Sequence, residues 1–322
     1  MKICIVGPGA IGGSIANRFA AHTGENVAVL ARGAALDALR RNGVTLIVGG
    51  RRTTVPVRAS ANPAELGPQD VVILAVKAYS LAALAPSLVP MLTPDTVVVP
   101  VQNGIPWWYF YKEGGRLDGS RLTAIDPDGA IERALPSRQA VGAVTYAGAR
   151  VPAPGVIDLT LDELMLFGEP DGTSSPRLLR TVGLFEQAGF KCQATPEIRK
   201  AIWLKMWGNA TMNPVSVLAN ATIDRMLGDP AVKATLAAAM LEVRAVAGAL
   251  GLSFELTLDQ RFAQAAELGA FKTSMLQDLE AGRALEIEAL VGVVVELAHK
   301  LDVKVPVMET VYALTRLRGL RA

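Results

Sequence analysis

The segment IVGPGAIGG, at residues 5–13, limits the fold more than any other feature of the chain. The apolar run KICIVG leads into it and a stretch with helical periodicity follows, so the chain is predicted to pass from strand through turn into helix. In that setting Gly7 permits a tight turn, Gly9 lets the backbone approach a pyrophosphate, and Gly12 allows close packing of helix on strand. We therefore predict a dinucleotide site formed by Gly7, Pro8, Gly9, Ala10, Ile11 and Gly12.

Up to residue 195, short β-rich runs alternate with helical patterns, which is typical of βαβ units and a parallel sheet. After NVAVLA, further strands of one large sheet are predicted at 43–58, 71–76, 96–101 and 141–148. The runs PGVIDLT and ELMLFGE are predicted to form a late antiparallel pair, followed by a helix at 175–189 and a strand at 190–195.

From Pro196 onward the strand patterns disappear, and long helical periodicities run to the end. The predicted fold is therefore α/β, with an N-terminal Rossmann-type dinucleotide-binding domain at residues 1–195 and an all-α C-terminal domain at residues 196–322. The segment 104–139 combines WWYFY with a stretch rich in Gly, Asp and Arg. We interpret it as an elaborated loop that borders the site.

Composition excludes several classes of function. The chain has 322 residues, 51% of them hydrophobic, and its 32 basic and 30 acidic residues form no basic block, which argues against nucleic-acid binding. Its apolar runs are far shorter than the roughly 20 residues that span a bilayer. Two cysteines and two histidines, widely spaced, offer no metal-ligand pattern. We expect a cytoplasmic protein without a metal.

The second strand, NVAVLAR, lacks the acidic residue that would contact an adenosine ribose, and Arg32 follows it instead. An arginine there can bind a 2′-phosphate through two hydrogen bonds, which favours NADP over NAD, although a surface arginine would give the same pattern. Lys77 follows the strand VVILAV, at the edge of the sheet where ligands bind in such folds. It is either a second cofactor contact or a solvated loop lysine.

In LKMWGNATMNP, at 204–214, Lys205, Asn209 and Asn213 recur at steps of four, so a helix would place them in one polar stripe. A solvated helix face explains the stripe equally well. The later segment TSMLQDLEAGRALEIEAL adds polar residues among apolar ones, namely Ser274, Asp278, Arg283 and Glu286. A carbonyl-reducing nicotinamide enzyme needs a proton donor and groups that hold the substrate, and these two segments contain both.

Five motifs together resemble the ketopantoate reductase (2-dehydropantoate 2-reductase) family, in the order in which that family has them. They are IVGPGAIGG, VKAYS, VQNG, WLKMWGNATMNP and SMLQDLEAGRALEIEA. The resemblance covers most of the chain and implies a Rossmann domain, a helical domain and a site in the cleft between them.

The resemblance also implies roles for individual residues. Lys205 is similar to the family's proton donor, and Asn103 to the residue near the nicotinamide. Glu286 resembles an acid that touches the cofactor and orders the site. The implied substrate contacts are Asn103, Asn209, Asn213 and Ser274, and the implied cofactor contacts include Arg32, Lys77, Asn103 and Glu286. In one departure, Ile223 stands where some members place another substrate-binding asparagine.

The leading interpretation is an NADPH-dependent reductase that converts 2-dehydropantoate (ketopantoate) to (R)-pantoate in pantothenate biosynthesis. Alternatives are a reductase of another small 2-oxo acid, a related 3-hydroxy acid dehydrogenase, and a non-catalytic NADP-sensing protein. The alanine-rich helical faces are consistent with either a core or a homodimer interface.

Overall fold

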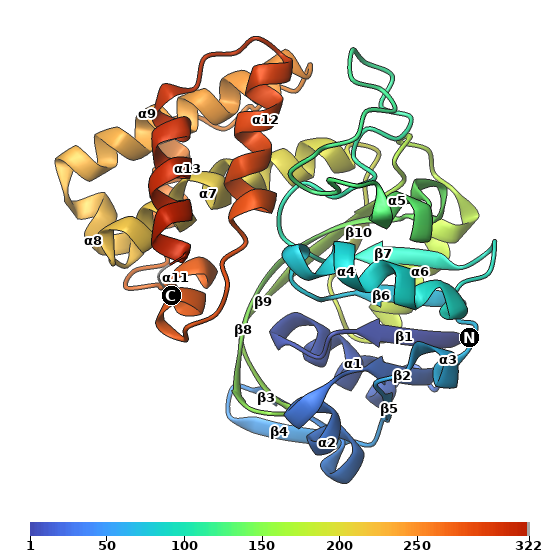
Figure 1. The fold of residues 1–322 in the computed structure, drawn as a ribbon. Coiled ribbons are helices and arrows are strands. Elements are labelled where there is room, and N and C mark those ends of the chain that lie inside the picture. The colour runs from blue at the N-terminus through green and yellow to red at the C-terminus, as the bar shows by residue number, and fades with distance from the viewer. Residues whose placement is uncertain (321–322) are drawn as a thin grey trace.

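The computed structural model describes residues 1–320, with residues 162 and 163 described by their backbone alone. Two sheets with their helices form the N-terminal part, and helices form the C-terminal part (Figure 1). The predicted fold class, a Rossmann-type domain followed by an all-α domain, is confirmed.

The first sheet contains five parallel strands in the order β5-β2-β1-β6-β7. They are β1 Lys2–Val6, β2 Asn26–Leu30, β5 Arg58–Ser60, β6 Val71–Leu74 and β7 Val97–Pro100. From the central β1 the chain moves to β2 on one side and later to β6 on the other. Such a reversal opens a crevice at the carboxyl ends of two strands, and here those ends are the paired residues Val6 and Leu74.

Helices cover both faces of this sheet. The helices of the N-terminal part are α1 Ala10–His22, α2 Gly33–Asn42, α3 Pro63–Leu66, α4 Ala78–Leu88, α5 Ala130–Ala134 and α6 Pro176–Gln187, with 3-10 turns at Val89–Met91 and Ser137–Gln139. Among them, α6 packs against α1 and the other sheet of the molecule. Ile5 of β1 belongs to one buried cluster with Phe19 of α1, whereas Cys4 belongs to another with Leu81 of α4. Because both faces are buried, β1, β2, β6 and β7 are apolar along almost their whole length instead of alternating, whereas the edge strand β5, with the sequence RAS, is polar.

A second sheet packs against α1, and it was not predicted. It contains β3 Val44–Val48, β4 Arg51–Val55, β8 Gly142–Ala153, β9 Val156–Gly168 and β10 Cys192–Ala194. The prediction of one large sheet is therefore wrong. The late antiparallel pair is also wrong, because PGVIDLT and ELMLFGE lie on the single strand β9, which pairs with β8. The pairing of β8 with β9 shifts register at several points, and it continues through the polar residues that separate the two apolar runs.

The C-terminal part contains seven α-helices and a π-helical turn within the described residues. They are α7 Ile198–Ala219, α8 Ile223–Gly228, α9 Pro230–Ala249, α10 Leu258–Ala266, α11 Ser274–Glu280, α12 Val293–Lys300 and α13 Pro306–Gly319, with the turn at Glu288–Gly292. The central helix α7 contacts α9, α11 and α13 on one side and β8 on the other (Figure 1). Its Trp203 and Trp207 are fully buried. This packing holds α7 firmly across the junction of the two parts.

Residues 105–110 of the segment 104–139 pack against the helical part, whereas residues 111–121 are exposed or half-buried. Trp108 and Tyr109 are buried, and the indole of Trp203 on α7 donates a hydrogen bond to the Tyr109 hydroxyl at 2.7 Å. The guanidinium of Arg199 donates to the Tyr109 carbonyl as well. The segment is thereby anchored to the helical part beside the site.

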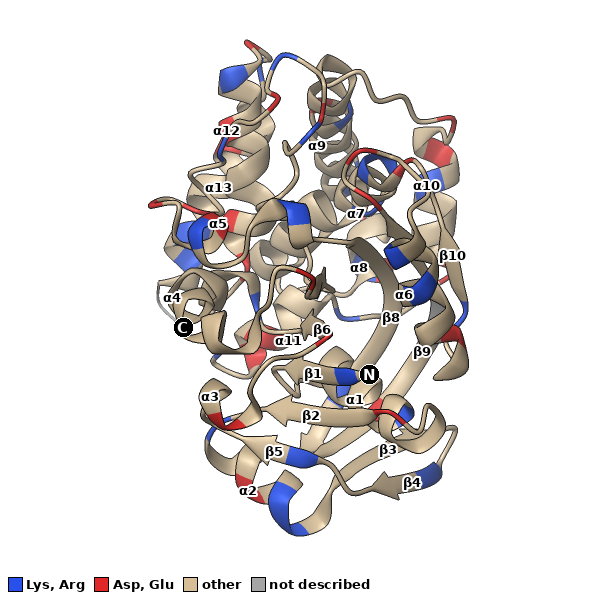
Figure 2. Ribbon diagram, turned by 90° about the vertical axis from the view of Figure 1, so that its right-hand side faces the viewer, with Lys and Arg blue, Asp and Glu red and all other residues tan. Residues whose placement is uncertain are grey.

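Charged residues of both signs are interspersed over the two parts (Figure 2). No helix among residues 1–320 combines the length and apolar character that crossing a bilayer requires.

Candidate active site

The glycine loop after β1 has the geometry of a phosphate cradle. Gly7 has a φ of +92°, and a Cβ on Gly12 would lie 2.1 Å from the Gly7 carbonyl oxygen, so neither position tolerates a side chain. Gly9, at the N-cap of α1, faces open space. Backbone N–H groups at the start of a 13-residue helix attract anions, and the loop therefore fits the pyrophosphate of a dinucleotide.

The two predicted phosphate and ribose contacts lie in different environments. Arg32 is exposed at the N-cap of α2, just past the carboxyl end of β2. Lys77, at the N-cap of α4, is instead part of an ion-pair cluster between the two parts of the molecule. It is therefore not a solvated loop lysine.

In this cluster, Lys77 Nζ lies 2.6 Å from Asp278 Oδ2 and 3.0 Å from Glu286 Oε2. Burial favours the neutral amine, but the charges and hydrogen bonds of the two carboxylates outweigh it, and the pKa of Lys77 is raised. The other Glu286 oxygen accepts the backbone N–H of Ala78 at 3.1 Å, and Arg283 Nε donates to Asp278 at 2.8 Å. The cluster joins the start of α4 to α11 and the chain that follows it.

A close backbone contact fixes the position of Asn103. Its neighbour Gly104 has a φ of +94°, and a Cβ there would lie 2.3 Å from the carbonyl oxygen of Ala289 in the π-helical turn. The Ile105 N–H donates to the same carbonyl at 3.3 Å. Only glycine allows this approach, so Gly104 of the VQNG motif is required for the packing beside Asn103.

Lys205 has the perturbed chemistry expected of a functional amine. Its Nζ donates a hydrogen bond to the Thr145 carbonyl of β8 at 2.6 Å. Desolvation by burial lowers the pKa of Lys205 to about 8, against the opposing influence of the Glu286 carboxylate. A lysine with such a pKa exchanges protons readily near neutral pH, which suits general acid catalysis.

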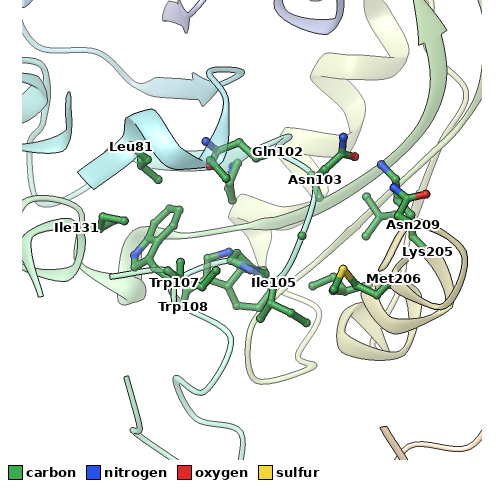
Figure 3. Close-up of a pocket in the computed structure, with 18 residues that line it drawn as sticks. Leu81, Gln102, Asn103, Ile105, Trp107, Trp108, Ile131, Lys205, Met206 and Asn209 are labelled. Carbon is green, nitrogen blue, oxygen red and sulfur yellow. The ribbon is translucent and has the colours of Figure 1, made fainter. Parts of the chain in front are cut away.

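A cavity between the two parts brings together Asn103, Lys205 and Asn209 (Figure 3). Within the described part of the chain, neither asparagine side chain has a hydrogen-bond partner. The opposite wall is apolar, and Figure 3 shows it formed by Leu81, Ile105, Trp107, Trp108 and Ile131. The cavity therefore has a polar end for a small oxygen-rich group and an apolar end largely supplied by the 104–139 segment, which borders it as predicted.

The other predicted substrate contacts lie outside this cavity. Asn213 is buried one turn further along α7, and Ser274 is exposed at the start of α11. A hydrogen bond of 2.6 Å between the hydroxyls of Ser216 and Thr273 ties these two helices together. The polar stripe of α7 thus runs from the cavity toward α11. Ile223 is buried at the start of α8 and supplies no polar group.

Two components of the site have no role in the sequence-based interpretation. Asp278 was grouped with the polar residues of its segment, but its pairing with Lys77 links residues 201 positions apart. Thr145 contributes a backbone carbonyl, which every residue has, so no sequence signal marks it.

Comparison with known proteins agrees with this architecture. The family described as ketopantoate reductase PanE/ApbA matches residues 3–172, and its C-terminal domain matches residues 197–319. The domain boundary at 195 stays a prediction. A 2-dehydropantoate 2-reductase from Mesorhizobium japonicum is 42% identical over 98% of this chain and 97% of its own length.

Solved structures show the same fold. A protein from Ralstonia solanacearum, assigned as a ketopantoate reductase, superposes with a TM-score of 0.95 at 44% identity, covering 99% of this chain and 98% of that one. A 2-dehydropantoate 2-reductase from Methylococcus capsulatus gives a TM-score of 0.83 at 29% identity, covering 100% and 97%.

Proposed function

This chain belongs to the ketopantoate reductase family, and we propose that it reduces a small 2-oxo acid with NADPH, with ketopantoate to (R)-pantoate as the leading assignment. The product would enter pantothenate biosynthesis in the cytoplasm. The observation that carries the proposal is the desolvated Lys205 amine, which lies in one cavity with two carboxamides that have no hydrogen-bond partner among the described residues.

In this proposal NADPH, when bound, supplies the hydride. The Lys205 ammonium donates a proton to the substrate oxygen as that oxygen gains negative charge. The Thr145 carbonyl holds one N–H of the amine and thereby orients the others. Asn103 and Asn209 line the same cavity, and their carboxamides can donate to and accept from the oxygen groups of the substrate.

Cofactor preference is proposed from the residues around the loop. Arg32 is exposed beside the carboxyl end of β2 and would bind the 2′-phosphate of NADPH. Lys77 and Glu286 are proposed as further cofactor contacts, and their ion pair would adjust to the bound molecule. Asn213 and Ser274 complete the proposed substrate contacts along α7 and α11. A homodimer also stays a prediction.

The apolar end of the cavity favours one second candidate, the reduction of a small 2-oxo acid with a branched or larger apolar side chain. Leu81, Ile105 and Ile131 carry no polar side-chain atom, and the Trp107 indole N–H is already bonded to the Leu135 carbonyl at 2.9 Å. Of the described residues in this wall, only Trp108 has a side-chain N–H without a partner, and that atom is buried.

Oxidation of NADPH with ketopantoate, 2-oxoisovalerate and pyruvate tests the assignment. We expect kcat/KM to be highest for ketopantoate. Lys205→Ala should lower this kcat/KM by a factor of about 10² to 10⁴. Equal values for the three acids would contradict the pantoate assignment. Undiminished reduction by folded Lys205→Ala would contradict the mechanism.

A further inference from the structure

Arg261 of α10 is a partly buried cation for which the structure describes no anionic partner. Its Nε is fully buried, and no acceptor for that N–H exists among the described residues. Its Nη1 donates only to the neutral side-chain oxygen of Gln264, at 3.3 Å. Burial lowers the pKa of Arg261; the Tyr146 phenol acts against this effect, but no carboxylate among the described residues does.

The guanidinium lies against the catalytic face of α7. A Cβ on Gly208 would lie 2.3 Å from Arg261 Nη2, so the cation occupies the space that a side chain at this position would fill. Residues three apart on a helix are surface neighbours, and Gly208 is three residues after Lys205. Arg261 therefore lies beside the polar stripe formed by Lys205 and Asn209.

Tyr146 of β8 is a neighbour of both cations. Its ring centroid lies 6.0 Å from Lys205 Nζ, and its phenol raises the pKa of Arg261 against the effect of burial. Together with Gly208, Tyr146 places Arg261 on the side of α7 that carries Lys205.

A desolvated cation without a counter-ion is costly, and the cost falls when an anion binds. The cavity groups near Lys205 are neutral carboxamides, which orient a carboxylate but do not neutralise it. Arginine is suited to that task because its planar fork donates two parallel hydrogen bonds to a carboxylate.

We propose that Arg261 binds the carboxylate of the 2-oxo acid substrate and of its 2-hydroxy acid product, and that Gly208 is required to admit its guanidinium. This inference rests on the proposed function and deepens it, because it assigns recognition of the acid group to a residue outside the family-like motifs. Lys205 then remains free to act on the carbonyl oxygen.

Binding of a product-like acid and of its neutral amide tests the proposal. The probes are 2-hydroxyisovalerate and 2-hydroxyisovaleramide, each titrated calorimetrically into the protein with NADP⁺ present. A charge-assisted contact typically changes a binding affinity by a factor of about ten or more. Arg261→Gln should therefore lower the affinity for 2-hydroxyisovalerate by that factor. The affinity for the amide should not change. Equal losses for both probes, or no loss for the carboxylate, would overturn the proposal.

Gly208→Ala is a second variant that leaves the arginine in the chain. Its methyl group displaces the flexible end of Arg261, so carboxylate binding should weaken again, and the double variant should be no weaker than Arg261→Gln alone. Additive losses would contradict the proposed coupling. Arg225→Gln, which removes an exposed arginine from α8, is the matched control and should bind both probes normally.

The same proteins are assayed for turnover of 2-oxoisovalerate. If the wild type reduces 2-oxo acids with NADPH but Arg261→Gln binds the carboxylate probe as tightly as the wild type does, only the inference is refuted. Wild-type protein that reduces no 2-oxo acid refutes the proposed function itself.

Discussion

The lowered pKa of Lys205 can be measured in two independent ways. Burial moves it from 10.5 to about 8, and the charged form is therefore less stable in the folded protein than in the unfolded chain. The penalty is fully present below the folded pKa and disappears as the pH rises toward the unfolded pKa. Between about pH 7 and about pH 9.5 the wild type should gain about 2 kcal/mol of unfolding free energy relative to Lys205→Met.

Urea unfolding of both proteins at the two pH values measures this difference, because effects of other groups cancel in the comparison. Lys200→Met is a control for removing an ammonium from the same helix, because Lys200 lies outside the cavity, 3.8 Å from the Glu197 carboxylate. The second measurement is kinetic. A general acid must be protonated, so kcat/KM for reduction should fall as the pH rises above about 8.

A stability difference between wild type and Lys205→Met that is the same at both pH values would show that the amine is not desolvated. A reduction rate that stays constant well above pH 8 would separately show that the Lys205 ammonium does not donate the proton. Either result refutes the corresponding step of the reasoning.

Three further predictions concern cofactor and substrate. Arg32→Ala should weaken NADPH binding about ten-fold or more and leave NADH binding unchanged, as measured by fluorescence titration. Equal losses of affinity for the two cofactors would show that Arg32 does not bind the phosphate. Gly12→Ala places a methyl group 2.1 Å from the Gly7 carbonyl oxygen and should weaken the binding of NADPH and NADH alike. Unchanged affinities would contradict the proposal that this loop binds the pyrophosphate. Asn209→Ala and Ser274→Ala should raise the substrate KM while the Kd of NADPH persists, and a variant with normal kinetics would not contact the substrate.

The long strand β9 shows where local patterns fail. Its apolar runs, PGVIDLT and ELMLFGE, are interrupted by polar residues, and such an interruption is typical of a turn. Pairing with β8 on one side and with β3 and β10 on the other supplies backbone hydrogen bonds throughout, so the strand continues. Pairing partners distant in sequence decided its length.

The sequence by itself determined the glycine loop and the stripe of Lys205 and Asn209, because both depend on spacing within a single element. Only the tertiary structure decided what surrounds them. The hydrogen bond from Lys205 to the Thr145 carbonyl spans 60 positions and uses a backbone group that no residue type marks. The partners of Lys77, and the lack of an acceptor for Arg261 Nε among the described residues, likewise arise where distant segments pack together. Periodicity determines which side chains share a face, but desolvation and ion pairing depend on what covers that face.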